Sequence, residues 1–214
     1  MEERSDGNLL AAWALGDAEA FTALVRHHEG AILRYARALL GDWRGGEDVV
    51  QEVFLRLSRK PPTLPPDALG NAEAERSLLS GWLHQVARNL CMDTKRSENR
   101  RRHREEAVAR REATGGGIDT VEARDTRAAV ERGLSRLPED QREVLALRLF
   151  GEKSYKEIAT ITGKKMGTIG WLVSVGLKSL AGDLAPILQA AAPARDVGST
   201  GNDSGIQSLP GGLS

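Results

Sequence analysis

The chain has 214 residues, of which 40% are hydrophobic, which suffices for one large domain or two small ones. Its 30 basic and 30 acidic residues give a formal net charge of zero, so overall charge does not argue for a polyanionic partner. The single cysteine, Cys91, excludes an internal disulfide and a multi-thiolate metal site, and we expect a small buried residue there. Since the first residues are polar and no long apolar run follows, we expect a cytoplasmic protein without membrane insertion.

The basic residues are unevenly distributed along the chain. Between Arg88 and Arg111 there are nine basic and four acidic residues, a local excess of five. We therefore expect one segment of the chain to be able to face a polyanion although the whole molecule is neutral.

Helical periodicity dominates, and no stretch alternates like a strand. A first helical segment follows Asp17, which is placed as an N-cap; it is one helix, or two that break near Gly30. Its apolar positions recur at three- and four-residue steps: Phe21, Leu24, Val25, His28, Ile32, Tyr35, Ala36 and Leu39. A second helix is predicted from about Glu47, with an apolar face and an acidic edge. That apolar face comprises Val49, Val50, Val53, Phe54 and Leu57.

Repeated prolines predict a loop over Pro61 to Gly70, because proline lacks a backbone donor and clashes with a preceding helical turn. A third helix then runs into the basic segment and carries Leu79, Trp82, Leu83, Val86 and Leu90 on one face. We expect Trp82 to pack in the core rather than to serve as a stacking platform. Three consecutive glycines in the segment from Thr114 to Asp119 predict a flexible connection between domains.

The second domain is predicted to begin near Asp125 with a helix to about Arg136, followed by another begun by Pro138. Ser154 to Glu157 has the pattern of a capping box for a short helix that Gly163 ends, and a longer helix follows. A short helix, a glycine turn and a longer helix form a helix-turn-helix. The residues after Ala191 are rich in Gly, Ser and Pro, and we expect them to be disordered.

Taken together, residues 15–184 resemble the extracytoplasmic-function group of bacterial RNA polymerase sigma factors. The resemblance rests on GGEDVVQEVFLRL, GWLHQVARNLCMDTKR and LSRLPEDQREVLALRLF followed by SYKEIATITG, which occur in the order of that family. It implies an all-α fold of two small helical domains joined by a flexible linker. We expect an N-terminal extension (1–14), a region 2 domain (15–104), a linker (105–124), a region 4 helix-turn-helix domain (125–184) and a tail (185–214).

The resemblance implies that the chain binds core RNA polymerase and promoter DNA, and it leaves open an anti-sigma partner. The implied polymerase-binding residues are Asp48, Gln51, Glu52 and Phe54. An acidic helix edge beside an apolar ridge fits a helix-on-helix interface. In isolation such charges more commonly form a solvated surface, and the neighbouring motifs favour the docking interpretation.

The third helix resembles the promoter-melting helix of the family. Its implied DNA-binding residues are Arg88, Asn89, Lys95, Arg96 and Arg100. Basic side chains neutralise phosphates, and an amide offers both a donor and an acceptor to an opened base. The resemblance further implies that the loop from Pro61 to Ser80 holds a flipped base.

The last helix departs from the family pattern. Lys165 stands where a capping serine is usual, and Gly170, Leu172 and Val175 occupy positions that are commonly basic. We expect Ile169, Leu172, Val173, Gly176, Leu177 and Leu180 to face inward and Thr168, Gly170, Trp171, Ser174 and Val175 outward. The candidate DNA-binding residues of this domain are Lys164, Lys165, Thr168, Trp171, Ser174 and Lys178. With so few donors, the domain binds DNA weakly or through apolar and shape contacts, or it meets a protein.

Three other classes of protein compete with this interpretation. An enzyme or metal site is disfavoured because the adjacent His27 and His28 point about 100° apart on a helix, and we expect His27 to face solvent. No nucleotide-binding loop or nucleophile elbow is recognisable, so we expect no catalytic residue, metal, cofactor or small-molecule substrate. The other rivals are a conventional helix-turn-helix regulator and a sigma-like protein whose second domain binds a protein rather than DNA.

Overall fold

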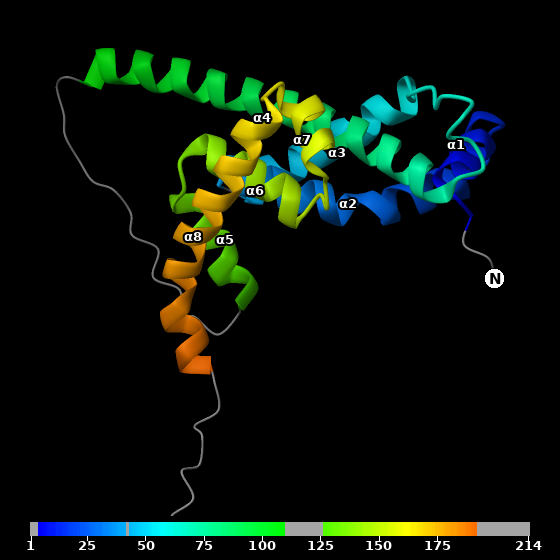
Figure 1. Cartoon of the computed structure of the whole chain (residues 1–214). Coiled ribbons are helices and arrows are strands. Elements are labelled where there is room, and N and C mark those ends of the chain that lie inside the picture. Colours follow the sequence, from blue (N-terminus) through cyan, green and yellow to red (C-terminus); the bar gives the residue numbers. More distant parts are fainter. Residues whose placement is uncertain (1–3, 42, 110–125, 192–214) are drawn as a thin grey trace, which may run out of the picture.

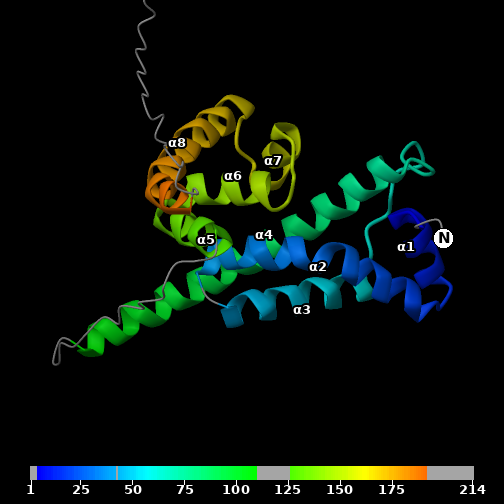
Figure 2. The same cartoon turned by 90° about the horizontal axis from the view of Figure 1, so that it is seen from below.

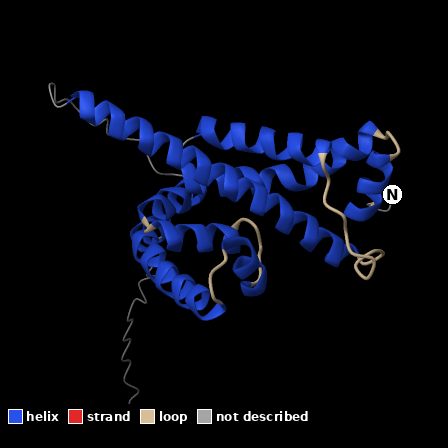
Figure 3. Cartoon of the chain, turned by 90° about the horizontal axis from the view of Figure 1, so that it is seen from above, coloured by secondary structure: helices blue, strands red, loops and turns tan. Residues whose placement is uncertain are grey.

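A computed structural model describes residues 4–41, 43–109 and 126–191 of the chain. Over these residues the regular structure is helical throughout (Figure 1 and Figure 3). The helices are α1 (Asp6–Ala14), α2 (Ala18–Leu40), α3 (Trp43–Arg59), α4 (Ala72–Ala109), α5 (Thr126–Arg136), α6 (Glu139–Leu149), α7 (Tyr155–Thr162) and α8 (Met166–Ala191).

The first unit is built on α2, which packs against α1, α3 and α4. Asp17 caps α2 as predicted, and its carboxylate accepts hydrogen bonds from the backbone N–H groups of Glu19 and Ala20. The helix is continuous through Gly30, which removes the alternative of a break there. The apolar faces predicted for α2, α3 and α4 meet in the core, which includes Leu24, Ile32, Tyr35, Val53, Leu57, Leu79 and Leu83. Cys91 is fully buried as expected, and burial raises the pKa of its thiol to about 12.

Helix α1 was not anticipated, since residues 1–14 were assigned only as an extension. It packs against α2 and α4 and buries Leu9, while the Trp13 ring contacts the Phe21 ring with centroids 4.8 Å apart. The side chain of Ser5 caps the helix by accepting from the backbone N–H of Asn8. The structure therefore extends this packed unit beyond the segment in which the family resemblance lies.

Helix α4 spans 38 residues and runs from the end of the proline-rich loop into the basic segment. It begins at Ala72, so the loop predicted over Pro61 to Gly70 is confirmed, whereas the wider segment to Ser80 that the resemblance implied includes the first turns of α4 (Figure 3). The remainder is helical because Asn71 caps the first turn by accepting from the backbone N–H of Ala74. Trp82 is partly buried and packs against the core.

The second unit contains the predicted helix-turn-helix in α7 and α8. The capping box is present, with the Ser154 hydroxyl accepting from the Glu157 N–H and the Glu157 carboxylate accepting from the Ser154 N–H. Gly163 ends α7 in the left-handed conformation, with φ of 72°. Pro138 precedes α6 at the N-cap rather than lying inside its first turn.

Two predictions for α8 were wrong. Leu177 was expected to face inward, yet 42% of its surface is exposed. The reason is that α8 packs tightly on α6 at Gly176, where an added Cβ would lie 2.8 Å from the Leu145 Cδ1 atom, and the next residue turns about 100° away. In addition, α8 continues to Ala191, past the boundary at residue 184 that was predicted between the helix-turn-helix domain and the tail. The glycine-rich connection at 114–119 and the tail beyond 191 lie outside the described residues.

The two units pack directly against each other. Helices α5 and α6 contact α2, and α7 contacts α4 (Figure 2). The buried apolar residues of both units join in one core cluster. We call this packing of α5–α8 on α2 and α4 the closed arrangement.

Candidate functional site

The acidic edge predicted on α3 is open to solvent. Asp48 and Gln51 are exposed, and the Glu52 carboxylate accepts from Arg56 Nε at 2.9 Å on the same helix. Phe54, which was predicted with them as a polymerase-binding residue, is buried with 7% exposure. The polar side chains are therefore the more accessible part of this surface, and the small exposed part of Phe54 lies in the wall of the adjacent groove.

A largely apolar groove of about 610 Å³ lies beside this edge, between α2 and α3. Its walls include Phe21, Val25, Leu33, Val50, Phe54 and Leu55, with Gln51 among the polar lining residues. Leu55 is 40% exposed. An apolar groove with acidic and amide groups beside it is suited to receive the side chains of a partner helix.

The basic face of α4 is partly covered in the closed arrangement. Arg88 Nε donates to the Glu143 Oε1 atom of α6 at 2.7 Å, and Glu143 is only 2% exposed. Lys95 Nζ donates to Glu139 Oε1 at 2.6 Å, also on α6. Two side chains predicted to contact promoter phosphates are therefore paired with carboxylates of the second unit.

The other predicted melting residues are accessible. Asn89, Arg96 and Arg100 are exposed on α4, and Arg96 forms an exposed ion pair with Asp93 at 3.2 Å. Exposed pairs of this kind contribute little to stability and are readily exchanged for a phosphate. The structure thus divides the predicted set into residues that DNA can reach and residues that it reaches only if α6 moves away.

A histidine that the sequence reasoning missed lies where the two units meet. His84 of α4 is fully buried, its ring contacts the Tyr35 ring with centroids 5.4 Å apart, and its Nδ1 atom donates to the Ser80 carbonyl at 2.7 Å. Burial lowers the pKa of His84 to about 4, so the ring is neutral at neutral pH. A Cβ atom at Gly151 would lie 2.8 Å from His84 Nε2, so glycine permits this close approach of the turn after α6.

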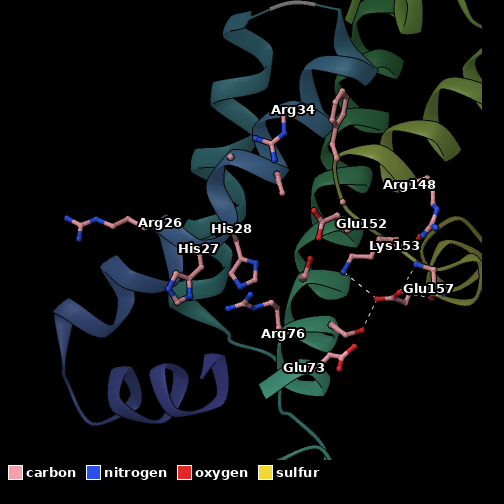
Figure 4. Close-up of a pocket in the computed structure, with 17 residues that line it drawn as sticks. Arg26, His27, His28, Arg34, Glu73, Arg76, Arg148, Glu152, Lys153 and Glu157 are labelled. Carbon is pink, nitrogen blue, oxygen red and sulfur yellow. Dashed lines mark hydrogen bonds and ion pairs between the residues drawn. The ribbon is translucent and has the colours of Figure 1, made fainter. Parts of the chain in front are cut away.

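A polar cavity of about 760 Å³ separates α2 and α4 from the turn between α6 and α7 (Figure 4). Its lining mixes both signs of charge and includes Arg34, Arg76, Arg148, Lys153, Glu73 and Glu157. On one wall the Glu157 carboxylate accepts from Ser77 Oγ at 2.7 Å and contacts Lys153 Nζ at 3.4 Å. Burial opposes ionisation of Glu157, but the hydrogen bonds from Ser154 and Ser77 outweigh it and hold its pKa at about 2. Arginine and lysine thus contribute five side chains to the lining and glutamate contributes three, so the cavity has a small excess of positive charge and carries both signs on its walls.

The predicted DNA-contacting residues of α8 lie mostly on its open side. Lys165, Thr168, Ser174 and Lys178 are exposed, whereas Lys164 Nζ donates to Asp140 Oδ1 of α6 at 2.8 Å. Trp171 is 61% exposed and Met166 is 55% exposed. The outer side of this helix-turn-helix thus combines a few polar groups with large apolar side chains.

Only one of the two adjacent histidines lies as predicted. His28 is buried on the apolar stripe as expected, but His27 turns toward α1 instead of solvent. The buried Asp6 carboxylate meets both rings, at 3.3 Å from His27 Nδ1 and 2.7 Å from His28 Nε2. Burial favours protonation of Asp6, but hydrogen bonds and charge from His28 and then His27 lower its pKa. Each ring uses a different carboxylate oxygen, which is how side chains about 100° apart share one partner.

Two other features, metal centres and membrane-spanning helices, concern residues 4–41, 43–109 and 126–191. No cluster of three or more His, Cys, Asp or Glu residues with the geometry of a metal site was found in that part of the chain. Nor does any described helix have both the length and the apolar character needed to cross a membrane.

Comparison with known proteins places both units in one family. Residues 24–101 match the model of sigma-70 region 2, and residues 127–180 match a model of sigma-70 region 4. The chain is 32% identical to the ECF RNA polymerase sigma factor SigM of Mycobacterium tuberculosis, covering 78% of each protein. It is 27% identical to the RNA polymerase sigma-H factor of Pseudomonas aeruginosa, covering 89% of this chain and 100% of that protein.

Solved structures agree with this match. The fold is similar to that of the sigma factor RpoE of Bartonella quintana in complex with the anti-sigma factor NepR, with a TM-score of 0.57 and 25% identity. That similarity covers 76% of this chain and 92% of the other. CnrH in complex with the cytosolic domain of CnrY shares the fold with a TM-score of 0.54 at 21% identity, over 88% of this chain and 100% of that one. The order of the two matched regions, their helical folds and the identity to curated relatives establish that the chain belongs to the extracytoplasmic-function family of RNA polymerase sigma factors.

Proposed function

We propose that the groove between α2 and α3, with Asp48, Gln51 and Glu52 beside it, is the surface through which this sigma factor docks on RNA polymerase. As a member of its family, the chain binds core RNA polymerase and directs promoter recognition and transcription initiation. The observation that carries the residue assignment is the junction of an open apolar groove with an exposed acidic edge. This combination supplies both apolar burial and charge complementarity to a partner helix.

We also propose that Arg88, Asn89, Lys95, Arg96 and Arg100 contact the opened promoter strands. Their basic groups neutralise phosphates, and the exposed members lie along one long helix. Since Arg88 and Lys95 are paired with α6, full engagement of DNA requires the closed arrangement to open. Binding to polymerase is the step at which we expect this opening.

For the second unit, the exposed polar groups of α8 support contact with upstream promoter DNA. The candidates are Lys164, Lys165, Thr168, Trp171, Ser174 and Lys178. The exposure of Trp171 and Met166 favours an alternative in which this helix meets a protein. A holoenzyme carrying Lys165→Ala should lose upstream-element binding if the first assignment holds, whereas unchanged binding favours the protein-binding alternative.

The family assignment extends to partners and location. RpoE of Bartonella quintana is solved with an anti-sigma factor, and we propose that this chain too is held by an anti-sigma protein. The family consists of regulatory initiation factors, and we propose that the chain has no catalytic site of its own. We expect it in the cytoplasm, where its polymerase acts.

The docking assignment is tested by measuring affinity for core polymerase and transcription from genomic fragments. Asp48→Lys reverses a charge on the exposed edge of α3 and should weaken polymerase binding at least about tenfold. Glu98→Lys makes the same change at an exposed position on α4 and serves as the matched control. Equal affinities of the two variants would refute the docking surface. Stable DNA binding by the wild type without polymerase association would instead support a conventional regulator.

A further inference from the structure

Glu75 joins two segments that lie far apart in the sequence. It stands in the first turn of α4 and is 2% exposed. Its Oε2 atom accepts from the backbone N–H of Gly7 in α1 at 3.0 Å, and its Oε1 atom accepts from the backbone N–H of Gly70 at 2.8 Å. Ser5 adds a side-chain hydrogen bond, and together with the backbone donors it lowers the pKa of Glu75. One ionised carboxylate thus holds both α1 and the end of the loop at residues 60–71.

Helix α1 is itself held firmly at this place. Asp6, beside Gly7, is fixed by the two histidine rings of α2, and Leu9 is buried in the core. The approach to Glu75 depends on glycine, since a Cβ atom at Gly7 would lie 2.5 Å from the Glu75 Cδ atom. The position of the carboxylate therefore follows the position of α1.

The other end of this connection is the loop that enters α4. Gly70 has a φ of 85°, in the left-handed region, so its N–H group reaches Glu75 through a conformation that favours glycine. The neighbouring Ala68 is buried, while Leu69 is 56% exposed. The outer surface of the loop is thus presented to solvent, and its inner end is fixed by Glu75.

We propose that Glu75 is a positioning residue for promoter opening, through which α1 fixes the loop at residues 60–71. This inference rests on the proposed function in promoter opening, together with the expectation from the family resemblance that this loop receives a flipped base. A flipped base must enter a preformed pocket, and a loop with a free end loses affinity through the cost of ordering it. Helix α1 lies outside the segment that matches region 2, at residues 24–101, so the connection adds an element to the matched domain.

The test compares holoenzymes on a duplex promoter fragment that the wild type transcribes. In Glu75→Gln the side chain keeps one acceptor oxygen and turns an N–H donor toward a backbone N–H, so one of the two contacts is lost. Opening, measured by permanganate oxidation of unpaired thymines at equal polymerase occupancy, should fall about tenfold, equivalent to about 1.4 kcal/mol. Glu73→Gln, the same change at an exposed position of the same helical turn, is the matched control. It should open the promoter as the wild type does.

A second variant guards against misfolding of the first. Gly7→Ala moves the carboxylate from the α1 side and should lower opening in the same way, whereas Gly182→Ala, where a Cβ meets open space, should not. Affinity for core polymerase should stay within about twofold for every variant, because the groove between α2 and α3 is unchanged. Wild-type opening by both Glu75→Gln and Gly7→Ala would overturn the inference. A wild type that binds polymerase yet opens no promoter would overturn the proposed function instead.

Discussion

Replacing Glu143 with glutamine should shift the molecule out of the closed arrangement. The Glu143 carboxylate is buried and 2.7 Å from Arg88 Nε, and Arg88 retains 25% exposure of its side chain. Removing one partner of a fully buried pair costs about 3–5 kcal/mol. Because Arg88 already reaches solvent, we expect about 1–2 kcal/mol, which is roughly a five- to thirtyfold shift toward the open form. Lys95 would be released with it, since its partner Glu139 lies on the same helix.

The measurement is binding of the free protein to single-stranded DNA over a range of salt concentrations. Release of Arg88 and Lys95 should raise the affinity and steepen the salt dependence by about 0.7 per added phosphate contact, or about 1.4 for two. Glu98→Gln removes an equal charge from an exposed position on α4 and controls for the change in net charge. Identical affinities and salt slopes for the two variants would refute the reasoning that α6 masks the basic face.

Three further predictions concern stability and the second unit. Since the pKa of His84 is depressed to about 4, its contribution to stability is present above pH 6.5 and is lost as pH falls toward 4; wild-type protein should lose about 1.4 kcal/mol by pH 5.5. Chemical denaturation above pH 6.5 and at pH 5.5 should show a smaller loss of unfolding free energy in His84→Gln than in the wild type. An equal loss in the two proteins would contradict the attribution of this pH dependence to His84. Ser154→Ala removes the capping box and should lower the free energy of unfolding by about 1 kcal/mol, whereas Ser174→Ala, at an exposed helical position, should change it by less than about 0.5 kcal/mol. Trp171→Ala should leave the unfolding midpoint nearly unchanged because the ring is exposed, yet it should weaken binding of upstream DNA or of a protein partner; unchanged binding of both would remove Trp171 from the site.

Local patterns predicted the helices well where the signal lies within a few residues. The capping box at Ser154, the glycine stop at Gly163 and the Asp17 cap all depend on neighbours in sequence, and the structure contains each of them. Helix α1 was missed because its stability comes from contacts with α2 and α4 rather than from a clear amphipathic stripe. Helix propensity alone does not predict a short helix of this kind.

The candidate site was predictable as a set of residues but not as a set of pairings. The exposure of Asp48 and Gln51 follows from the periodicity of α3, since they lie opposite its apolar face. The Arg88–Glu143 contact joins residues separated by 55 positions, and no local rule couples them. His27 is a similar case, because its direction depends on a carboxylate from a helix that was not foreseen.

Because residue 151 is a glycine, the closed arrangement is sensitive to a single substitution at this position. Any side chain there would press on both His84 Nε2 and the Leu147 carbonyl, each 2.8 Å from the added Cβ. Neither group belongs to the groove on α3 or to the outer side of α8. A substitution at residue 151 would therefore weaken the closed arrangement and change how readily the factor is recruited to polymerase. It would leave the docking groove and the outer side of α8, and with them the polymerase and promoter specificity, unaltered.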